Sequence, residues 1–193
     1  SSYEWCRLMK KMEKHHTVYT LDLIGCGRSD KPYLTYTNYL YVQLITDFIQ
    51  NVIGTKPDVI TTNHSVSFAV LAQNMNPDLI SRIVAINPPS IGSFERTTDR
   101  LSVVKKFLLE SPLLGTFLYN ILTHESNIAK ELRSVYFCKP QLVSSKMLDA
   151  YYEAAHMDKG HGKYLMASIK AHYTDNAIDH ALKNLQTPLY IIQ

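Results

Sequence analysis

Helical and β-rich segments alternate over the first half of the sequence, and this order restricts the fold more than any other feature. The predicted elements are a helix over residues 1–14, a strand over 17–24, a helix over 41–52, a strand over 59–62, a helix over 66–75 and a strand over 82–87. The strand segments are apolar enough to be buried on both faces, which is typical of parallel sheets covered by helices. The sequence therefore predicts an α/β fold with a parallel sheet.

A long helical segment then interrupts the alternation. Residues 97–185 have helical periodicity and no strand signal, and they are rich in tyrosine, leucine and lysine. The final run T-P-L-Y-I-I-Q, residues 187–193, is apolar after Pro188, and a strand is often preceded by such a turn residue. We therefore expect a helical insertion after which the chain returns to the sheet.

Charge and cysteine content exclude several classes of protein. The 20 Lys and Arg residues and the 17 Asp and Glu residues give a net charge of +3, and the basic residues are scattered along the chain. A nucleic-acid partner is therefore not expected. Cys6, Cys26 and Cys138 lack both the spacing of a zinc site and the density of a secreted disulfide scaffold. This usage favours a reducing compartment, and we expect a cytoplasmic protein.

The most apolar window, residues 107–122, is interrupted by Glu110, Pro112 and Gly115. It is also too short to span a bilayer. We expect two packed helices here and no integral membrane segment.

Ser65 lies between the strand over 59–62 and the helix over 66–75. A strand, a sharp turn and a helix form the context of the nucleophile elbow G-x-S-x-G. In this motif, small residues lie two positions before and two positions after the serine. Here the pattern is N-x-S-x-S, with Ser67 small enough to replace a glycine and Asn63 as the departure. A serine after a strand is also a common helix N-cap. The pattern alone leaves both roles for Ser65 open.

Two other motifs do not indicate a cofactor or a metal. G-C-G-R-S-D, residues 25–30, lacks the third glycine of a dinucleotide-binding loop, and the residues after it do not open a helix. H-M-D-K-G-H-G, residues 156–162, matches no zinc signature and is predicted to be a solvated loop. We expect neither a cofactor nor a metal ion.

Several segments together resemble the α/β-hydrolase fold family. V-Y-T-L-D-L-I-G-C-G-R-S-D-K-P, residues 18–32, is similar to the D-x-x-G-x-G-x-S-D-x-P segment that follows the fourth strand in these enzymes. N-H-S-V-S lies at about the expected distance downstream, and residues 76–89 resemble the helix end and sixth strand that follow the elbow. Residues 187–193 resemble the strand that leads to the acidic member of the triad. The resemblance covers essentially the whole chain.

This resemblance implies a domain organisation. Residues 1–91 would be the N-terminal part of an α/β-hydrolase core, residues 92–186 a helical cap, and residues 187–193 the return strand of the core. The cap loosely resembles those of the esterase, epoxide hydrolase and haloalkane dehalogenase branch. The segment with the second oxyanion donor would precede Ser1, and the triad acid and histidine would follow Gln193, so we expect a chain truncated at both ends that does not turn over substrate by itself.

The resemblance also implies a chemistry. Ser65 would attack a carbonyl carbon to form an acyl-enzyme, and the Val66 amide would be one oxyanion donor. Asn63, His64 and Ser67 would shape the elbow, and His64 lies too close to Ser65 in sequence to be the triad base. Family members with an aspartate at the elbow displace halide or open epoxides, so a serine favours ester, thioester, amide or C–C bond hydrolysis.

The substrate expected from the aromatic residues of the insertion is a small, hydrophobic carbonyl compound. These residues are Phe107, Phe117, Tyr119, Tyr136, Phe137, Tyr151, Tyr152, Tyr164 and Tyr173. Most of them are expected to form the core of the cap. The alternative function is that of a non-catalytic, hydrolase-like binding or scaffolding protein with a degenerate elbow, and Asn63 is the residue that supports it.

Overall fold

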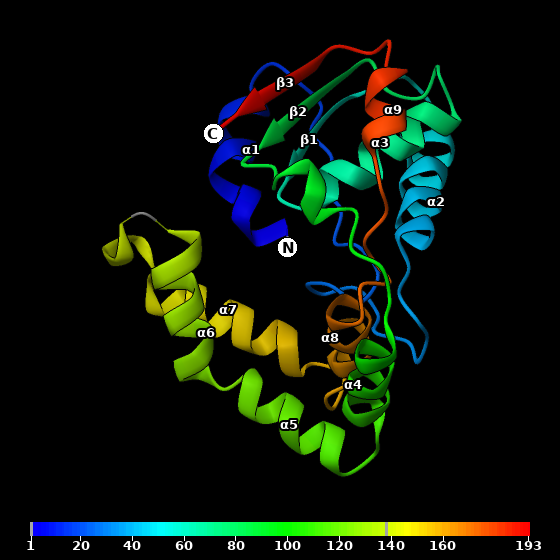
Figure 1. Cartoon of the computed structure of the whole chain (residues 1–193). Helices are drawn as coiled ribbons and strands as arrows, with labels where there is room; N and C mark the ends of the chain where they lie inside the picture. The colour runs from blue at the N-terminus through cyan, green and yellow to red at the C-terminus, as the bar shows by residue number, and fades with distance from the viewer. Residues whose placement is uncertain (1, 138) are drawn as a thin grey trace. The chain divides into compact units, whose positions relative to one another are not determined.

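The structure, a computed structural model, describes residues 2–137 and 139–193 (Figure 1). The third cysteine of the sequence, Cys138, lies outside the described residues. The chain divides into two compact units, and each is described by itself. One unit contains Ser1–Thr35 and Val104–Ala167, and the other contains Tyr36–Val103 and Ser168–Gln193.

The second unit is built on a parallel sheet of three strands in the order β1-β2-β3. The strands are β1 (Asp58–Thr62), β2 (Arg82–Ile86) and β3 (Leu189–Ile192). Ile83 in the central strand lies opposite Val59 of β1 and Leu189 of β3, and its side chain is fully buried. The predicted α/β fold with a parallel sheet is therefore confirmed, including the strand predicted from residues 187–193.

Helix α3 (Ser65–Met75) connects β1 to β2 and packs against both strands (Figure 1). Every residue of α3 from Val66 to Gln73 is buried, since α2 (Asn38–Phe48) and α9 (Asp179–Lys183) also contact it. The rings of Tyr41 in α2 and Phe68 in α3 stack with their centroids 4.8 Å apart. This packing fixes α3, and therefore also its first turn, against the sheet.

The end of helix α2 is set by a glycine. The helix continues into a π-helical turn, Ile49–Ile53, and Gly54 follows with a left-handed φ of 70°. A glycine in this conformation is a common helix stop because it has no Cβ to clash.

The first unit is helical throughout its regular elements. Its N-terminal residues form a 3-10 turn, Ser2–Trp5, and α1 (Cys6–Met12). The later elements are α4 (Arg100–Glu110), α5 (Leu114–Leu122), α6 (Glu125–Glu131), a π-helical turn at Leu132–Tyr136, a 3-10 turn at Pro140–Leu142, α7 (Ser145–His156) and α8 (Gly162–Lys170). The unit boundary falls within α4 and within α8. The prediction of helices over 97–185, including two in the apolar window, is confirmed.

Packing in this unit depends on a few buried groups. Ala129, Leu132, Val143 and Leu148 form one apolar cluster that joins α6 to α7. The hydroxyl of Tyr119 donates to the carbonyl of Ala155 over 2.7 Å, and burial raises the pKa of this phenol to about 12. Among the described residues, no helix has both the length and the apolar character needed to cross a membrane.

The predicted strand over residues 17–24 is wrong, because the structure assigns no strand there. A strand needs a neighbour to share its hydrogen bonds, and no described segment pairs with this one. The segment leads instead into a loop around Asp22. The Asp22 carboxylate accepts from the Arg28 amide over 3.0 Å, and its carbonyl accepts from the Ser29 hydroxyl. Asp22 therefore holds loop backbone.

Gly27 is required beside Asp22. It adopts a left-handed φ of 51°, and a Cβ at this position would overlap the Asp22 carboxyl group. The second glycine of the D-x-x-G-x-G segment is thus explained by close packing on its aspartate.

The charge of Asp22 makes a testable contribution to stability. Burial raises the pKa of this carboxyl, but hydrogen bonds from Arg28 and Ser2 outweigh burial and hold the pKa below its ordinary value. The stabilising contribution is therefore fully present above the unfolded pKa and is lost as pH falls through the folded pKa. We expect Asp22→Asn to lower the free energy of unfolding at pH 7 and to have progressively less effect below pH of about 4.

Urea titrations at both pH values measure this effect, with Asp30→Asn as the control because its exposed side chain lies in the same loop. A cost of Asp22→Asn that is equal at both pH values would contradict the assignment.

Candidate active site

Ser65 is the first residue of α3 and follows the turn that leaves the carboxyl end of β1. The turn consists of Asn63 and His64, both exposed, and Ser65 is partly buried. Asn63 has a left-handed φ of 49°. Asparagine tolerates this conformation better than most residues, because its short polar side chain can bond locally. The departure from glycine at this position is therefore compatible with a sharp turn.

The backbone strain lies at a different residue from the one expected of an elbow. In the G-x-S-x-G elbow the serine itself occupies the strained position. Among the described residues other than glycine, positive φ values occur at Asn63, Asn87, Lys159 and His172. Ser65 instead has the conformation of a helix start, and Asn63 carries the strain two residues earlier.

The Ser65 hydroxyl is bonded to the end of β1. It donates to the Thr62 carbonyl over 2.6 Å and accepts from the Thr62 amide over 3.2 Å. Together these bonds hold the oxygen against the strand. Attack on a substrate would require the hydroxyl to rotate away from Thr62.

The amides after Ser65 lie at the N-terminus of α3, where the helix dipole is positive. The buried Val66 amide donates to the Asn63 carbonyl over 3.4 Å, which is long for an N–H···O bond. The Ser67 amide donates to the His64 carbonyl over 3.1 Å. The weakly engaged Val66 amide is thus the better placed of the two to bind a developing negative charge.

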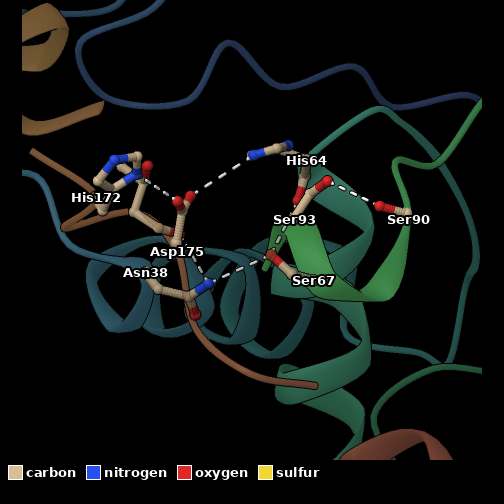
Figure 2. Close-up of polar contacts among 8 residues, drawn as sticks. Asn38, His64, Ser67, Ser90, Ser93, His172 and Asp175 are labelled. Carbon is tan, nitrogen blue, oxygen red and sulfur yellow. Dashed lines mark hydrogen bonds and ion pairs between the residues drawn. The ribbon is translucent and has the colours of Figure 1, made fainter. Parts of the chain in front are cut away.

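A polar cluster that the sequence did not predict surrounds this turn (Figure 2). The Asp175 side chain is 5% exposed, with one oxygen 2.9 Å from His172 Nδ1 and the other 3.6 Å from His64 Nε2. The His64 ring also lies against the Phe94 ring, with 5.2 Å between their centroids. Asp175 and His172 follow α8 in an H-Y-T-D sequence that matches no motif, so only the three-dimensional fold brings them to His64.

Asn38, the first residue of α2, completes the cluster. Its side-chain amide donates to the Ser67 hydroxyl over 3.3 Å and to the Thr174 carbonyl over 3.1 Å. The Ser67 hydroxyl in turn donates to the His64 carbonyl over 2.9 Å. Ser67, in the first turn of α3, therefore links Asn38 to the His64 carbonyl, and its small size leaves room for this contact.

The described residues contain no group of three histidine, cysteine, aspartate or glutamate side chains arranged to hold a metal ion. His156, from the densest histidine motif of the sequence, stacks on Tyr152 with ring centroids 4.2 Å apart. Its Nδ1 lies 2.9 Å from the Tyr152 carbonyl. This histidine is thus engaged by its own helix.

A comparison with protein families gives a match between residues 1–189 and the alpha/beta hydrolase family. The chain belongs to this family. No curated protein matched the sequence.

Solved structures of enzymes with this fold match nearly the whole chain. The epoxide hydrolase CorEH shares 16% identity at a TM-score of 0.72, with 99% of this chain and 70% of that chain covered. The haloalkane dehalogenase DatA from Agrobacterium tumefaciens C58 shares 17% identity at a TM-score of 0.67, with 99% and 67% covered. The meta-cleavage product hydrolase CumD, as its A129V mutant, shares 16% identity at a TM-score of 0.70, with 98% and 66% covered. At these identities the similarity shows the fold alone, and the chain spans about two thirds of each enzyme.

The left-handed conformation of Asn63 predicts an unusual order of substitution effects. Asn63→Gly should change the free energy of unfolding by only a few tenths of a kcal/mol, because glycine adopts positive φ without a Cβ clash. Asn63→Ala should cost about 1 kcal/mol, since alanine has neither glycine's freedom nor a polar side chain to bond locally.

Urea unfolding of the three proteins tests this order, with the exposed helical residue Asn74 changed to alanine as the control. A more stable alanine variant than glycine variant at position 63 would contradict the assigned conformation.

Proposed function

We propose that this chain is the part of a serine hydrolase that carries its nucleophile and helical cap, and that the whole protein cleaves an ester, thioester or similar carbonyl bond. The observation that carries this proposal is the position of Ser65 at the carboxyl end of β1 and the N-terminus of α3. Ligands of open α/β sheets bind at the carboxyl ends of the strands. A partly exposed serine at this point is the group best placed to react with one.

In the proposed reaction, Ser65 Oγ forms a bond to the carbonyl carbon as its proton passes to a general base. The carbonyl oxygen becomes negative and accepts from the Val66 amide, and the leaving group departs with a proton to give an acyl-enzyme. Water then releases the acid and restores Ser65. His64 is not the proposed base, because Asp175 and Phe94 hold its ring within the polar cluster.

The base, its acidic partner and the second oxyanion donor are proposed to come from the part of the whole protein that this chain does not span. This division fits the coverage of about two thirds of each matched enzyme. The matched enzymes include an epoxide hydrolase and a haloalkane dehalogenase. The family resemblance associates an aspartate at the elbow with halide displacement and epoxide opening, so a serine at position 65 favours a carbonyl substrate instead.

A hydrophobic substrate is the second element of the proposal. Helix α5 carries Leu114, Phe117 and Ile121 at helical spacing, and each of these side chains is exposed. An exposed apolar stripe on a helix of the proposed cap suits the acyl or aromatic part of a substrate better than a charged one.

A non-catalytic binding or scaffolding role is the second candidate, and one observation favours it. Ser65 lacks the strained conformation of an elbow nucleophile, and its hydroxyl is already bonded to Thr62. Both features are expected of a degenerate elbow, because a serine that caps a strand end does not need to face a substrate.

Covalent labelling of the full-length protein with a fluorophosphonate probe tests the two candidates. Ser65→Ala should reduce labelling by at least about 100-fold, since removal of a serine nucleophile abolishes covalent capture. Ser90→Ala is the matched control, because Ser90 is exposed and its hydroxyl contacts Ser93 instead of the turn. Equal labelling of wild type and Ser65→Ala would rule out Ser65 as the nucleophile and favour the binding role.

A further inference from the structure

The segment from Asn63 to Ser67 is called the Ser65 turn below. Side-chain contacts connect it to a second turn, residues 172–175, which begins 107 positions after Ser65 in the sequence. Both turns contain a non-glycine residue in the left-handed conformation, with φ values of 49° at Asn63 and 62° at His172. Each such residue is held against its intrinsic preference, so the surrounding contacts must supply the difference. The contacts between the two turns are the His64–Asp175 pair and the bridge through Asn38.

We propose that Asp175 and Asn38 are positioning residues that hold the Ser65 turn in its reactive place. This proposal rests on the proposed function of Ser65 for its effect on catalysis. The underlying contact between the two turns can be tested without any activity.

Asn38 forms the buried half of this connection. The residue is 2% exposed, and its side-chain amide donates to both Ser67 Oγ and the Thr174 carbonyl. Its backbone amide donates to the Tyr173 carbonyl over 3.1 Å. One residue at the start of α2 therefore binds the end of the Ser65 turn and two carbonyls of the second turn, in a site that water does not reach.

Asp175 forms the charged half (Figure 2). A carboxylate that is 5% exposed needs partners to offset its desolvation, and among the described residues the imidazoles of His172 and His64 contact it. His172 lies on the same turn, whereas His64 is the residue before Ser65. The carboxylate thus links His172, which has the left-handed conformation, to His64, which precedes the proposed nucleophile.

His64 transmits this connection to Ser65. Asp175 and the Phe94 ring hold its side chain, and its carbonyl accepts from both the hydroxyl and the amide of Ser67. The peptide group between His64 and Ser65 is therefore held in two ways, at the His64 carbonyl oxygen and through the His64 side chain. Reaction rates at a nucleophile depend steeply on such placement, because a shift of about 1 Å can cost about 100-fold.

Amide hydrogen exchange on the full-length protein tests the contact itself. In Asp175→Asn, the amides of Val66 and Ser67 should exchange at least about three-fold faster than in wild type, because the turn opens more easily. The Ile83 amide, which donates to Pro188 within the sheet, should exchange at its wild-type rate. Asp78→Asn is the matched control, since its 92% exposed carboxylate pairs with Lys56 after the far end of α3.

Fluorophosphonate labelling then tests the effect on Ser65. Asp175→Asn should lower the maximal labelling rate at least about ten-fold and leave the half-saturating probe concentration unchanged, since orientation is lost and binding is not. His64→Gln provides a second variant at an exposed position. The combined variant should be slowed less than the product of the two single effects, because both changes remove the same contact.

The outcomes separate the two proposals. Unchanged exchange at Val66 and Ser67 in both single variants would overturn the positioning role, and so would unchanged labelling kinetics in a protein that labels at Ser65. If wild type and Ser65→Ala label equally, the proposed function fails, and the exchange result still decides whether Asp175 holds the turn.

Discussion

The burial of α3 against the parallel strands β1 and β2 is the constraint on which the rest of the candidate site depends. Eight successive residues of α3 are buried, so the helix cannot shift without exposing apolar surface on several sides. Its first turn is therefore fixed relative to the carboxyl end of β1. A two-residue connection must join the two elements, and the backbone can turn that sharply only if one residue adopts an unusual conformation. Asn63 is that residue.

Replacement of a flanking glycine by Asn63 places additional demands on the surrounding residues. Asparagine restricts the unfolded chain more than glycine does, but it also brings a side chain that must stay clear of the close strand and helix. The structure leaves Asn63 exposed, and the buried Asn38 side chain donates to the Ser67 hydroxyl. A glycine at position 63 would need less support from the surrounding residues. With Asn63 in the turn, the polar cluster around His64 and Asp175 supplies this support.

Much of this fold could be predicted from the sequence, because hydrophobic periodicity and turn residues are local signals. The strands at 59–62, 82–87 and 187–193 and the helix that begins near Ser65 are examples. The segment over 17–24 shows the limit of this approach, since a β-rich composition forms a strand only where a neighbour can share its hydrogen bonds. Asp175 shows a second limit. Its contact with His64 joins residues 111 positions apart, and no local pattern around either residue encodes that distance.

The bond between Ser65 and Thr62 favours the non-catalytic candidate, but its energy is too small to decide between the two candidates. A neutral hydrogen bond contributes about 1 kcal/mol net, which corresponds to less than about ten-fold in a population. A catalytic base that binds the hydroxyl equally well would replace the bond at almost no cost. The absence of a positive φ at Ser65 is the stronger objection, because it concerns the direction of the side chain. A reactive Ser65 therefore requires that Asn63, instead of the serine, supply the sharp change in chain direction, with Asp175 and Asn38 holding the result in place.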